Sequence, residues 1–270
     1  MLKRIRKILK GLRDPATKRE MRFAMLWRLG KRIMPEYRFE WPQLAWWHDE
    51  AFNRYLKQFR ELDGLNTPRR WMLYQLTRLA GAVHGDTAEC GVFEGAGSYL
   101  ICRSLGEHPG ISRTHFIFDS FEGLSAPTMA EGSYWTAGNL TCDLDAVKLN
   151  LASVKNISWH KGWIPGRFSD AADRKFCFVH IDVDLYEPTR DSIQFFYPRM
   201  NEGGIILCDD YGFTSCPGAT RAIEEFLKDK PEKMLALASG GGFLIKGRKT
   251  ADLAELSQGG GPAKANGQPL

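Results

Sequence analysis

Two short apolar stretches, each followed by a pair of aspartates, constrain this chain more than any other feature. Residues 176–181 and 204–208 are hydrophobic and lack a helical period, which is typical of buried parallel strands. The segment between them, 188–200, opens with Pro and Thr and is followed by two glycines, a pattern that predicts a helix. Together these segments predict a strand–helix–strand unit of an α/β sheet.

Four aspartates follow the carboxyl ends of these two predicted strands, namely Asp182, Asp184, Asp209 and Asp210. Ligands bind at this edge of an open α/β sheet. Carboxylates that converge there repel one another unless a cation neutralises them, and carboxylate oxygens are ligands that Mg²⁺ prefers. The pattern therefore predicts a metal site, although helix N-caps and turns would account for one or two of the four.

A glycine-rich turn follows an earlier predicted strand, residues 87–91. It reads G-V-F-E-G-A-G-S and leads into a predicted helix at 99–105. Glycine lets the backbone approach a ligand closely, and a helix N-terminus presents free amide N–H groups. The spacing E-x-G-x-x-x-G-x-G differs from the G-x-G-x-x-G of dinucleotide-binding proteins.

An acid closes the next predicted strand, residues 115–118. Asp119 lies twenty-two residues after Gly97, where a ribose diol needs a carboxylate acceptor; a turn aspartate is the alternative. A third strand at 157–160 is followed by Trp163, whose ring would lie on an adenine face or simply cover the sheet. The long irregular segment 122–139 is of a length that is commonly functional.

The rest of the chain yields further elements by the same criteria. Thr67 is placed as the N-cap and Pro68 as the first residue of a helix at 67–83. Three glycines at 240–242 separate two apolar runs, which predicts an antiparallel hairpin. The other predicted helices are 22–34, 49–62, 143–154 and 217–230, and the hairpin strands are 234–238 and 243–246.

Four motifs occur in order and at matched separations: A-E-C-G-V-F-E-G-A-G-S, F-D-S-F-E-G-L, H-I-D-V-D-L-Y-E-P-T and L-C-D-D-Y-G. Over roughly residues 67–247 the chain resembles the macrocin/mycinamicin (TylF/MycF) family of sugar O-methyltransferases. The resemblance implies the α/β class I methyltransferase fold, which is Rossmann-like and doubly wound, with a seven-stranded sheet ending in an antiparallel hairpin. It also implies S-adenosylmethionine and Mg²⁺ as cofactors.

The resemblance further implies roles for individual residues. Asp184, Asp209 and Asp210 are expected to hold the metal, and Asp184 is also expected to be the catalytic base. Asp182 lies on the same strand face, and contact with the metal or with the cofactor stays open for it. The residues expected to bind S-adenosylmethionine are Glu89, Gly91, Gly95, Gly97, Ser98, Asp119, Ser120, Phe121, Trp163 and Asp182.

Positive charge is concentrated at the beginning of the chain. Residues 1–38 hold thirteen of the 37 Lys and Arg residues but three of the 32 Asp and Glu residues. Residues 1–13 predict a short cationic amphipathic helix. Three interpretations of it stay open: packing on the body or on a second subunit, peripheral contact with anionic lipid, and nucleic-acid binding, which the lack of a base-reading motif disfavours.

These patterns divide the chain into three parts. Residues 1–66 form a basic helical extension with an aromatic cluster at 37–47, interpreted either as packing or as a lid over the site. Residues 67–247 form the methyltransferase domain, and the Gly- and Pro-rich tail 248–270 is expected to be disordered. Six cysteines without a C-x-x-C pair, and the lack of a membrane-length apolar run, favour a cytoplasmic protein with reduced thiols.

The expected acceptor is a hydroxyl of a sugar on a natural product, a glycolipid or a polysaccharide precursor. Two other functions stay open. A nicotinamide-dependent oxidoreductase is disfavoured by the glycine spacing and by the lack of a Tyr-x-x-x-Lys pair. A non-catalytic cofactor-binding scaffold acting through the basic arm is disfavoured by the four aspartates. The sequence does not identify the oligomeric state, and a homo-oligomer stays open.

Overall fold

The computed structural model describes residues 15–34, 40–41, 43–62, 66–105 and 110–251. The chain divides into two compact units, Met1–Pro68 and Arg69–Leu270. The predicted helix 1–13 and most of the predicted tail lie outside the described residues.

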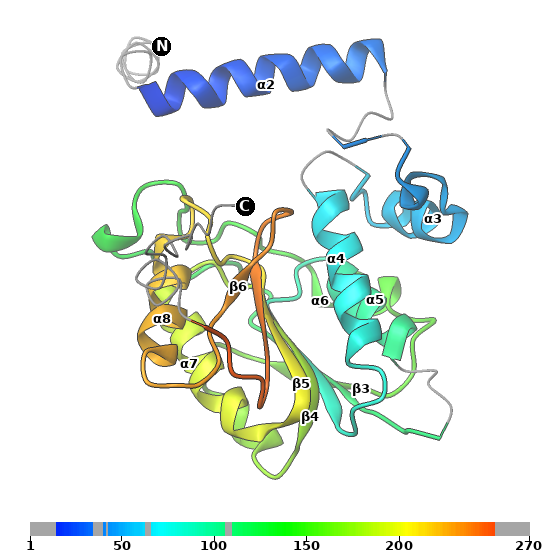
Figure 1. The fold of residues 1–270 in the computed structure, drawn as a ribbon, viewed down its shortest axis with the longest axis vertical. Helices are drawn as coiled ribbons and strands as arrows, with labels where there is room; N and C mark the ends of the chain where they lie inside the picture. The colour runs from blue at the N-terminus through cyan, green and yellow to red at the C-terminus, as the bar shows by residue number, and fades with distance from the viewer. Residues whose placement is uncertain (1–14, 35–39, 42, 63–65, 106–109, 252–270) are drawn as a thin grey trace, which may run out of the picture. The chain divides into compact units, whose positions relative to one another are not determined.

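The second unit is built on a seven-stranded sheet with the strand order β3-β2-β1-β4-β5-β7-β6 (Figure 1). The first five strands are parallel, and β7 runs antiparallel to both β5 and β6. The predicted class I methyltransferase sheet with its terminal hairpin is thus confirmed. The strands are β1 Asp86–Cys90, β2 His115–Asp119, β3 Ile157–Lys161, β4 Phe176–Ile181, β5 Met200–Cys208, β6 Leu235–Ala236 and β7 Gly242–Ile245.

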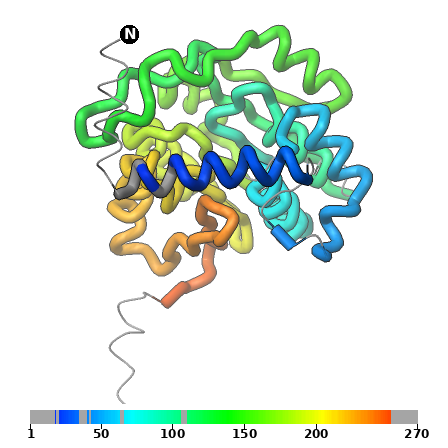
Figure 2. Tube along the Cα trace, turned by 90° about the horizontal axis from the view of Figure 1, so that it is seen from above, coloured from blue at the N-terminus to red at the C-terminus, as the bar shows by residue number. Residues whose placement is uncertain are grey.

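Helices cover both faces of this sheet. Figures 1 and 2 show α7 and α8 on one side of the sheet and α4 on the other. On the α7 side, Phe196 and Ile223 pack with Phe118 and Ile206 of the strands in one apolar core. The helices of this unit are α4 Asn66–Leu79, which crosses the unit boundary, α5 Ala96–Leu105, α6 Leu144–Asn150, α7 Tyr186–Phe196 and α8 Pro217–Leu227.

The connection from α7 to β5 differs from the prediction. The helix ends at Phe196, a 3₁₀ turn follows at Tyr197–Arg199, and β5 already begins at Met200. The two glycines that were expected to stop the helix lie inside β5. The β4–β5 register shifts there, and Gly203 has a φ of +80°, so these glycines mark an irregularity in the strand.

The start of α4 also needs correction. The helix begins at Asn66, so Thr67 lies inside it instead of capping it. The hydroxyl of Thr67 donates a hydrogen bond to the carbonyl of Glu61 at 2.8 Å. By contrast, Asp49 caps α3 Glu50–Gln58 by accepting from Phe52 N at 2.8 Å.

The first unit contains α2 Pro15–Ile33, a 3₁₀ turn Ala45–His48 and α3. Trp46 and Trp47 of the predicted aromatic cluster are buried, and the ring of Trp46 lies edge-on to that of Phe52 at 6.5 Å. These two residues therefore act in packing, whereas Trp41 is exposed. Residues 37 and 39 lie outside the described part, and the lid interpretation stays a prediction.

The long segment 122–139 is irregular, as predicted, apart from the 3₁₀ turn Met129–Glu131. Two of its side chains attach it to other parts of the second unit. Glu131 accepts from Tyr186 N at 2.6 Å, and the indole N–H of Trp135 donates to the sulfur of Cys216 at 3.3 Å. The segment is thereby fixed beside the start of α7 and α8.

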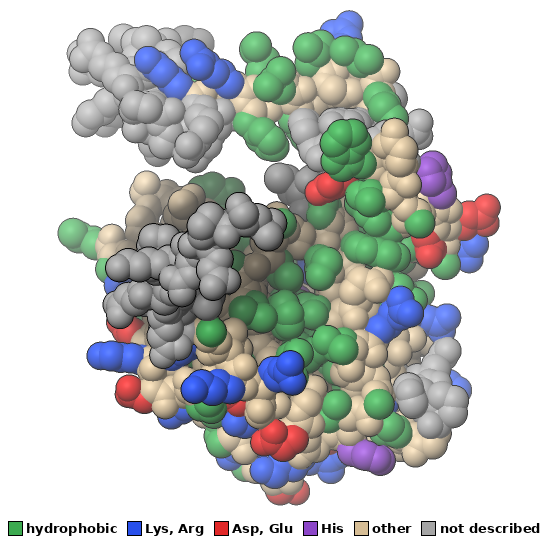
Figure 3. Space-filling view, viewed as in Figure 1, with side chains coloured by type: hydrophobic (Ala, Val, Ile, Leu, Met, Phe, Trp, Pro, Cys, Tyr) green, Lys and Arg blue, Asp and Glu red, His purple; other side chains and the backbone are tan. Residues whose placement is uncertain are grey.

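Acidic and basic side chains are interspersed over the lower part of the second unit in Figure 3, which is the ordinary pattern of a solvent-exposed surface. Among the described residues, no helix is both long and apolar enough to cross a membrane.

Candidate active site

The glycine loop, residues 91–95, connects β1 to α5 at the carboxyl edge of the sheet. Gly91 has a φ of +79°, and a Cβ atom there would overlap the carbonyl oxygen of Asp182. A Cβ atom on Gly97 would likewise overlap the side chain of Glu89. Both glycines are thus required by close packing within the protein, and the loop lies directly against the chain that leaves β4.

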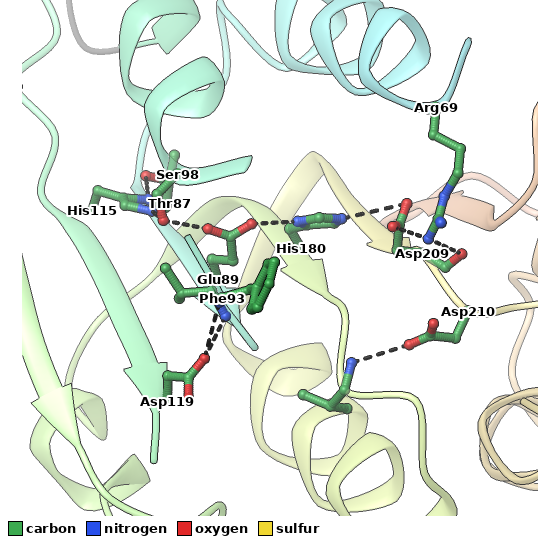
Figure 4. A network of polar contacts seen from close by, with 12 residues as sticks. Arg69, Thr87, Glu89, Phe93, Ser98, His115, Asp119, His180, Asp209 and Asp210 are labelled. Atoms are coloured by element: carbon green, nitrogen blue, oxygen red, sulfur yellow. Dashed lines mark hydrogen bonds and ion pairs between the residues drawn. The ribbon is translucent and has the colours of Figure 1, made fainter. Parts of the chain in front are cut away.

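Asp119, at the end of β2, holds this loop in place (Figure 4). One carboxylate oxygen accepts from Val92 N at 2.6 Å and from Phe93 N at 3.3 Å, and the other accepts from Phe121 N at 2.7 Å. A carboxylate can accept about four hydrogen bonds. Three of these are already taken by backbone N–H groups, so Asp119 can accept about one more. The role of Asp119 toward a ribose stays a prediction, and the structure adds a second role.

The other predicted cofactor residues fall into two groups. Trp163 is about half exposed, at 47%, directly after Gly162, whose N–H donates to the carbonyl of Asp119. Ser120 and Phe121, which follow Asp119 in the chain, are buried. In contrast, Glu89 and Ser98 are buried and bonded to each other, so their side chains lie behind the loop and are occupied by protein partners.

A chain of buried polar side chains runs from behind the glycine loop to the acids. Its order is Thr87, His115, Ser98, Glu89, His180 and Asp209 (Figure 4). The Nδ1 atom of His180 lies 2.7 Å from Glu89, and its Nε2 atom lies 3.7 Å from Asp209. The second distance is too long for a hydrogen bond, so the interaction between His180 and Asp209 is an ion pair when the imidazole is protonated.

The four aspartates lie in two groups instead of one. Ligand atoms of His180, Asp182 and Asp209 are within 4.8 Å of one another, and the same holds for Asp184, Asp210 and Cys216. The predicted metal set of Asp184, Asp209 and Asp210 is thus divided between the groups. The first and last of these are close together, whereas Asp209 is bonded to the guanidinium of Arg69.

Charge explains how these buried acids are accommodated. Burial raises the pKa of Asp209, but the cations of Arg69 and His180 outweigh it and hold that pKa well below its usual range. Burial, together with Asp182, raises the pKa of Asp184 to about 7. Burial, with Asp184 and Asp209, raises the pKa of Asp210 to about 8, and the charge of Arg69, which is paired with Asp209, offsets this only in part.

The backbone fixes the orientation of this second pair. Asp210 accepts from Val183 N at 3.0 Å and from Asp184 N at 2.7 Å through one oxygen. Asp184 has a φ of +59°, a left-handed conformation that Asp and Asn tolerate better than most residues. Two buried carboxylates this close, both with raised pKa values, suit a hard divalent cation, whereas Asp209 is bonded to Arg69.

Sequence reasoning missed Arg69, His180, His115 and Cys216. His180 was within reach, because it stands in the H-I-D-V-D motif and is the one polar residue of β4. No local pattern around Arg69 distinguishes it from the neighbouring Arg70, since its contact with Asp209 spans 140 residues.

The chain matches the family described as macrocin-O-methyltransferase (TylF) over residues 75–234. It belongs to this family. It is 30% identical over 156 residues to the 8-demethyl-8-(2,3-dimethoxy-alpha-L-rhamnosyl)-tetracenomycin-C 4'-O-methyltransferase of Streptomyces olivaceus, a match covering 53% of this chain and 59% of that protein. It is also 30% identical over 159 residues to the demethyldecarbamoylnovobiocin O-methyltransferase of Streptomyces niveus, with 53% and 58% covered.

The chain thus aligns with less than two thirds of the length of these curated relatives. Among solved structures, the calicheamicin methyltransferase CalS11 superimposes with a TM-score of 0.59 at 18% identity, over 74% of this chain and 92% of that chain. At this identity the likeness supports the fold alone.

The close approach at Gly91 leads to the first prediction. Gly91→Ala should destabilise the protein by more than the ~1 kcal/mol expected of a strained glycine replacement, because the new methyl group meets the backbone of Asp182. Thermal unfolding measures this, with about 2–4 °C expected per kcal/mol. Gly138→Ala is the matched control, since Gly138 has the same φ of +79° and nothing within 4 Å of an added Cβ. Equal effects in the two variants would contradict the packing role.

Proposed function

We propose that this TylF-family protein transfers a methyl group from S-adenosylmethionine to a hydroxyl of a sugar on a natural product, a glycolipid or a polysaccharide precursor, with Mg²⁺ as a second cofactor. The observation that carries the proposal is the close packing of Gly91 against Asp182. This contact brings the glycine loop against the residue after β4, at the edge of the sheet where the four aspartates follow β4 and β5. A loop at a helix N-terminus is suited to a nucleotide-like cofactor. Family membership and the rhamnosyl acceptor named for one relative support the same class of reaction.

The cofactor would occupy the loop side of this edge. Asp119 would accept a hydrogen bond from the ribose with its remaining lone pair. Its hydrogen bonds from backbone N–H groups would hold the glycine loop in shape at the same time. Trp163, exposed beside it, offers a flat apolar face for the adenine. Glu89 and Ser98 would act from behind the loop by holding its shape, because their polar atoms are bonded within the protein.

The acceptor would bind on the acid side. A sugar hydroxyl is too weakly acidic to attack at neutral pH without help. Asp184 would take its proton, because it is a buried carboxylate at the acid end of this edge. In the metal-free protein, burial and Asp182 raise its pKa to about 7, and bound Mg²⁺ would favour the ionised form that accepts a proton. Asp184, Asp210 and, after release from Arg69, Asp209 would hold Mg²⁺, which when bound supplies charge stabilisation for the developing alkoxide.

Methyl transfer from labelled S-adenosylmethionine tests the proposal. The acceptors are a panel of glycosides and glycolipid precursors, each assayed with and without EDTA. We expect label in at least one sugar hydroxyl, lost on chelation and restored by Mg²⁺. Binding of NADH in preference to S-adenosylmethionine would instead point to an oxidoreductase.

A second prediction concerns the cofactor. Asp119→Ala should weaken S-adenosylmethionine binding by about 1.5–3 kcal/mol, the contribution of a hydrogen bond to a charged group. Calorimetric titration of the purified variant measures it. Glu122→Ala is the control, because this exposed acid lies on the same loop and should leave the affinity unchanged. An unaltered affinity in folded Asp119→Ala would exclude the ribose role.

A further inference from the structure

We propose that Asp184, Asp210 and Cys216 form a binding site for a thiophilic divalent ion such as Zn²⁺ or Cd²⁺, and that this ion competes with Mg²⁺ for the two carboxylates. The competition rests on the proposed function, whereas the site itself rests on the three side chains. All three are buried, at 6%, 3% and 4% exposure, and their ligand atoms lie within 4.8 Å of one another.

The three residues come from different parts of the fold. Asp184 follows β4, Asp210 follows β5, and Cys216 is the residue that precedes α8. The backbone N–H of Cys216 donates to the carbonyl of Phe213 at 3.1 Å, which fixes the turn that brings the sulfur to the carboxylates. The sheet edge thus adds one soft ligand to two hard ones.

The spacing between sulfur and oxygen suits a tetrahedral ion. A Zn–S bond of about 2.3 Å and a Zn–O bond of about 2.0 Å, at a tetrahedral angle, place the two ligand atoms about 3.5 Å apart. The Sγ atom of Cys216 lies 3.5 Å from Oδ1 of Asp184. An ion could therefore contact both atoms without moving either residue.

The proposed ligands are themselves oriented by hydrogen bonds from neighbouring groups, as ligands in known metal sites are. The indole N–H of Trp135 can only donate, and it donates to the sulfur of Cys216 at 3.3 Å. Burial, with Asp210 and Asp184, nevertheless raises the pKa of this thiol to about 12, so the thiol would lose its proton only as the ion binds. Asp210 is oriented through one oxygen by the amides of Val183 and Asp184. Three protein ligands with a fourth position left for water or acceptor oxygen is the usual arrangement of a catalytic-type zinc site.

The chemistry of the donors separates this site from the Mg²⁺ site. Mg²⁺ takes oxygen ligands and gains little from a thiolate, whereas thiolates select ions such as Zn²⁺. Asp209 is not required, because it is paired with Arg69. An ion at this position would also occupy Asp184, so Zn²⁺ is expected to inhibit methyl transfer.

Cd²⁺ titration of the full chain, followed by its thiolate-to-metal charge-transfer absorbance, tests the proposal without any acceptor. We expect one thiolate band in the wild type, its loss in Cys216→Ser and Cys216→Ala, and its retention in Cys142→Ser, the matched thiol elsewhere in the domain. Calorimetry should show Zn²⁺ affinity reduced at least about tenfold in both Cys216 variants, with Mg²⁺ affinity little changed.

No thiolate band in the wild type, or a band that persists in a folded Cys216 variant, would overturn the site. The proposed function fails separately. If Mg²⁺-dependent transfer is absent while the Cys216 band is present, the ion site stands and the methyltransferase assignment does not. If transfer depends on Mg²⁺ and Zn²⁺ binds equally well to Cys216→Ser, the reverse holds.

Discussion

Removal of divalent cations is expected to lower the rate of methyl transfer at least ~100-fold, and Mg²⁺ is expected to restore it. The expectation follows from the pair Asp184 and Asp210, which are buried and whose pKa values are raised despite the charge of Arg69. A metal ion contributes several kcal/mol of charge stabilisation to such a transition state, and each 1.4 kcal/mol is a factor of about ten in rate. Turnover after exhaustive dialysis against EDTA, compared with EDTA preloaded with Mg²⁺, measures the effect.

The stabilisation of the protein by Mg²⁺ is expected to increase with pH. Because the pKa values of Asp184 and Asp210 are raised to about 7 and about 8, the folded metal-free protein holds protons that the unfolded chain has lost above pH ~4. Its stability should therefore fall as pH rises from about 4 to 8. Mg²⁺ binds the ionised carboxylates and releases these protons, so the Mg²⁺-induced increase in Tm should be larger at pH 8.5 than at pH 6. Full activity after chelation, or a Tm increase that shrinks with pH, would contradict a cation at these acids.

The sheet could be predicted from the sequence because its strands carry a local signal. Residues 176–181 became β4 with both ends correct, since a short run that is apolar except for His180 is typical of a buried strand. β5 was predicted four residues too short, because glycines that usually stop a helix lie here at a register shift. A strand irregularity depends on the neighbouring strand, and one segment read alone does not contain that information.

The sequence predicted which residue types form the candidate site. It did not predict which side chains interact with one another there. The sequence placed four aspartates at one edge, and they lie there. It did not separate Asp209 from Asp184 and Asp210, because the cation that holds Asp209 comes from Arg69 at the start of the second unit. Nor did it indicate that Glu89 would be occupied by His180, since the two residues are 91 positions apart.

The chain of buried polar side chains connects the glycine loop with the aspartates at the carboxyl edge of the sheet. Glu89 is bonded to Ser98 at the start of α5 and to His180 beside Asp209. Burial lowers the pKa of His180, but the carboxylates of Asp209 and Glu89 outweigh it and raise that pKa to about 10. A charged His180 interacts with both carboxylates, and Glu89 is also bonded to Ser98 of α5. The position of Asp209 therefore depends on that of α5.

Replacing Asp184 is expected to have the largest effect of any single substitution. Asp184→Asn keeps the size of the side chain and its tolerance for the left-handed backbone at φ +59°, so the protein should fold. The variant loses both a metal ligand and the proton acceptor, and loss of a general base alone costs about 10²–10⁴ in rate. Its activity should therefore fall further than its Mg²⁺ affinity does.

Asp210→Asn is the matched variant, because the amide oxygen can still accept from Val183 N and Asp184 N while one negative charge is lost. Saturating Mg²⁺ should partly restore turnover in Asp210→Asn but not in Asp184→Asn. Turnover across a Mg²⁺ titration, with S-adenosylmethionine affinity measured separately, distinguishes them. Cofactor affinity should be retained in both, since Asp119 and the glycine loop are untouched. Rescue of Asp184→Asn by metal would remove its role as base and leave it as a ligand alone.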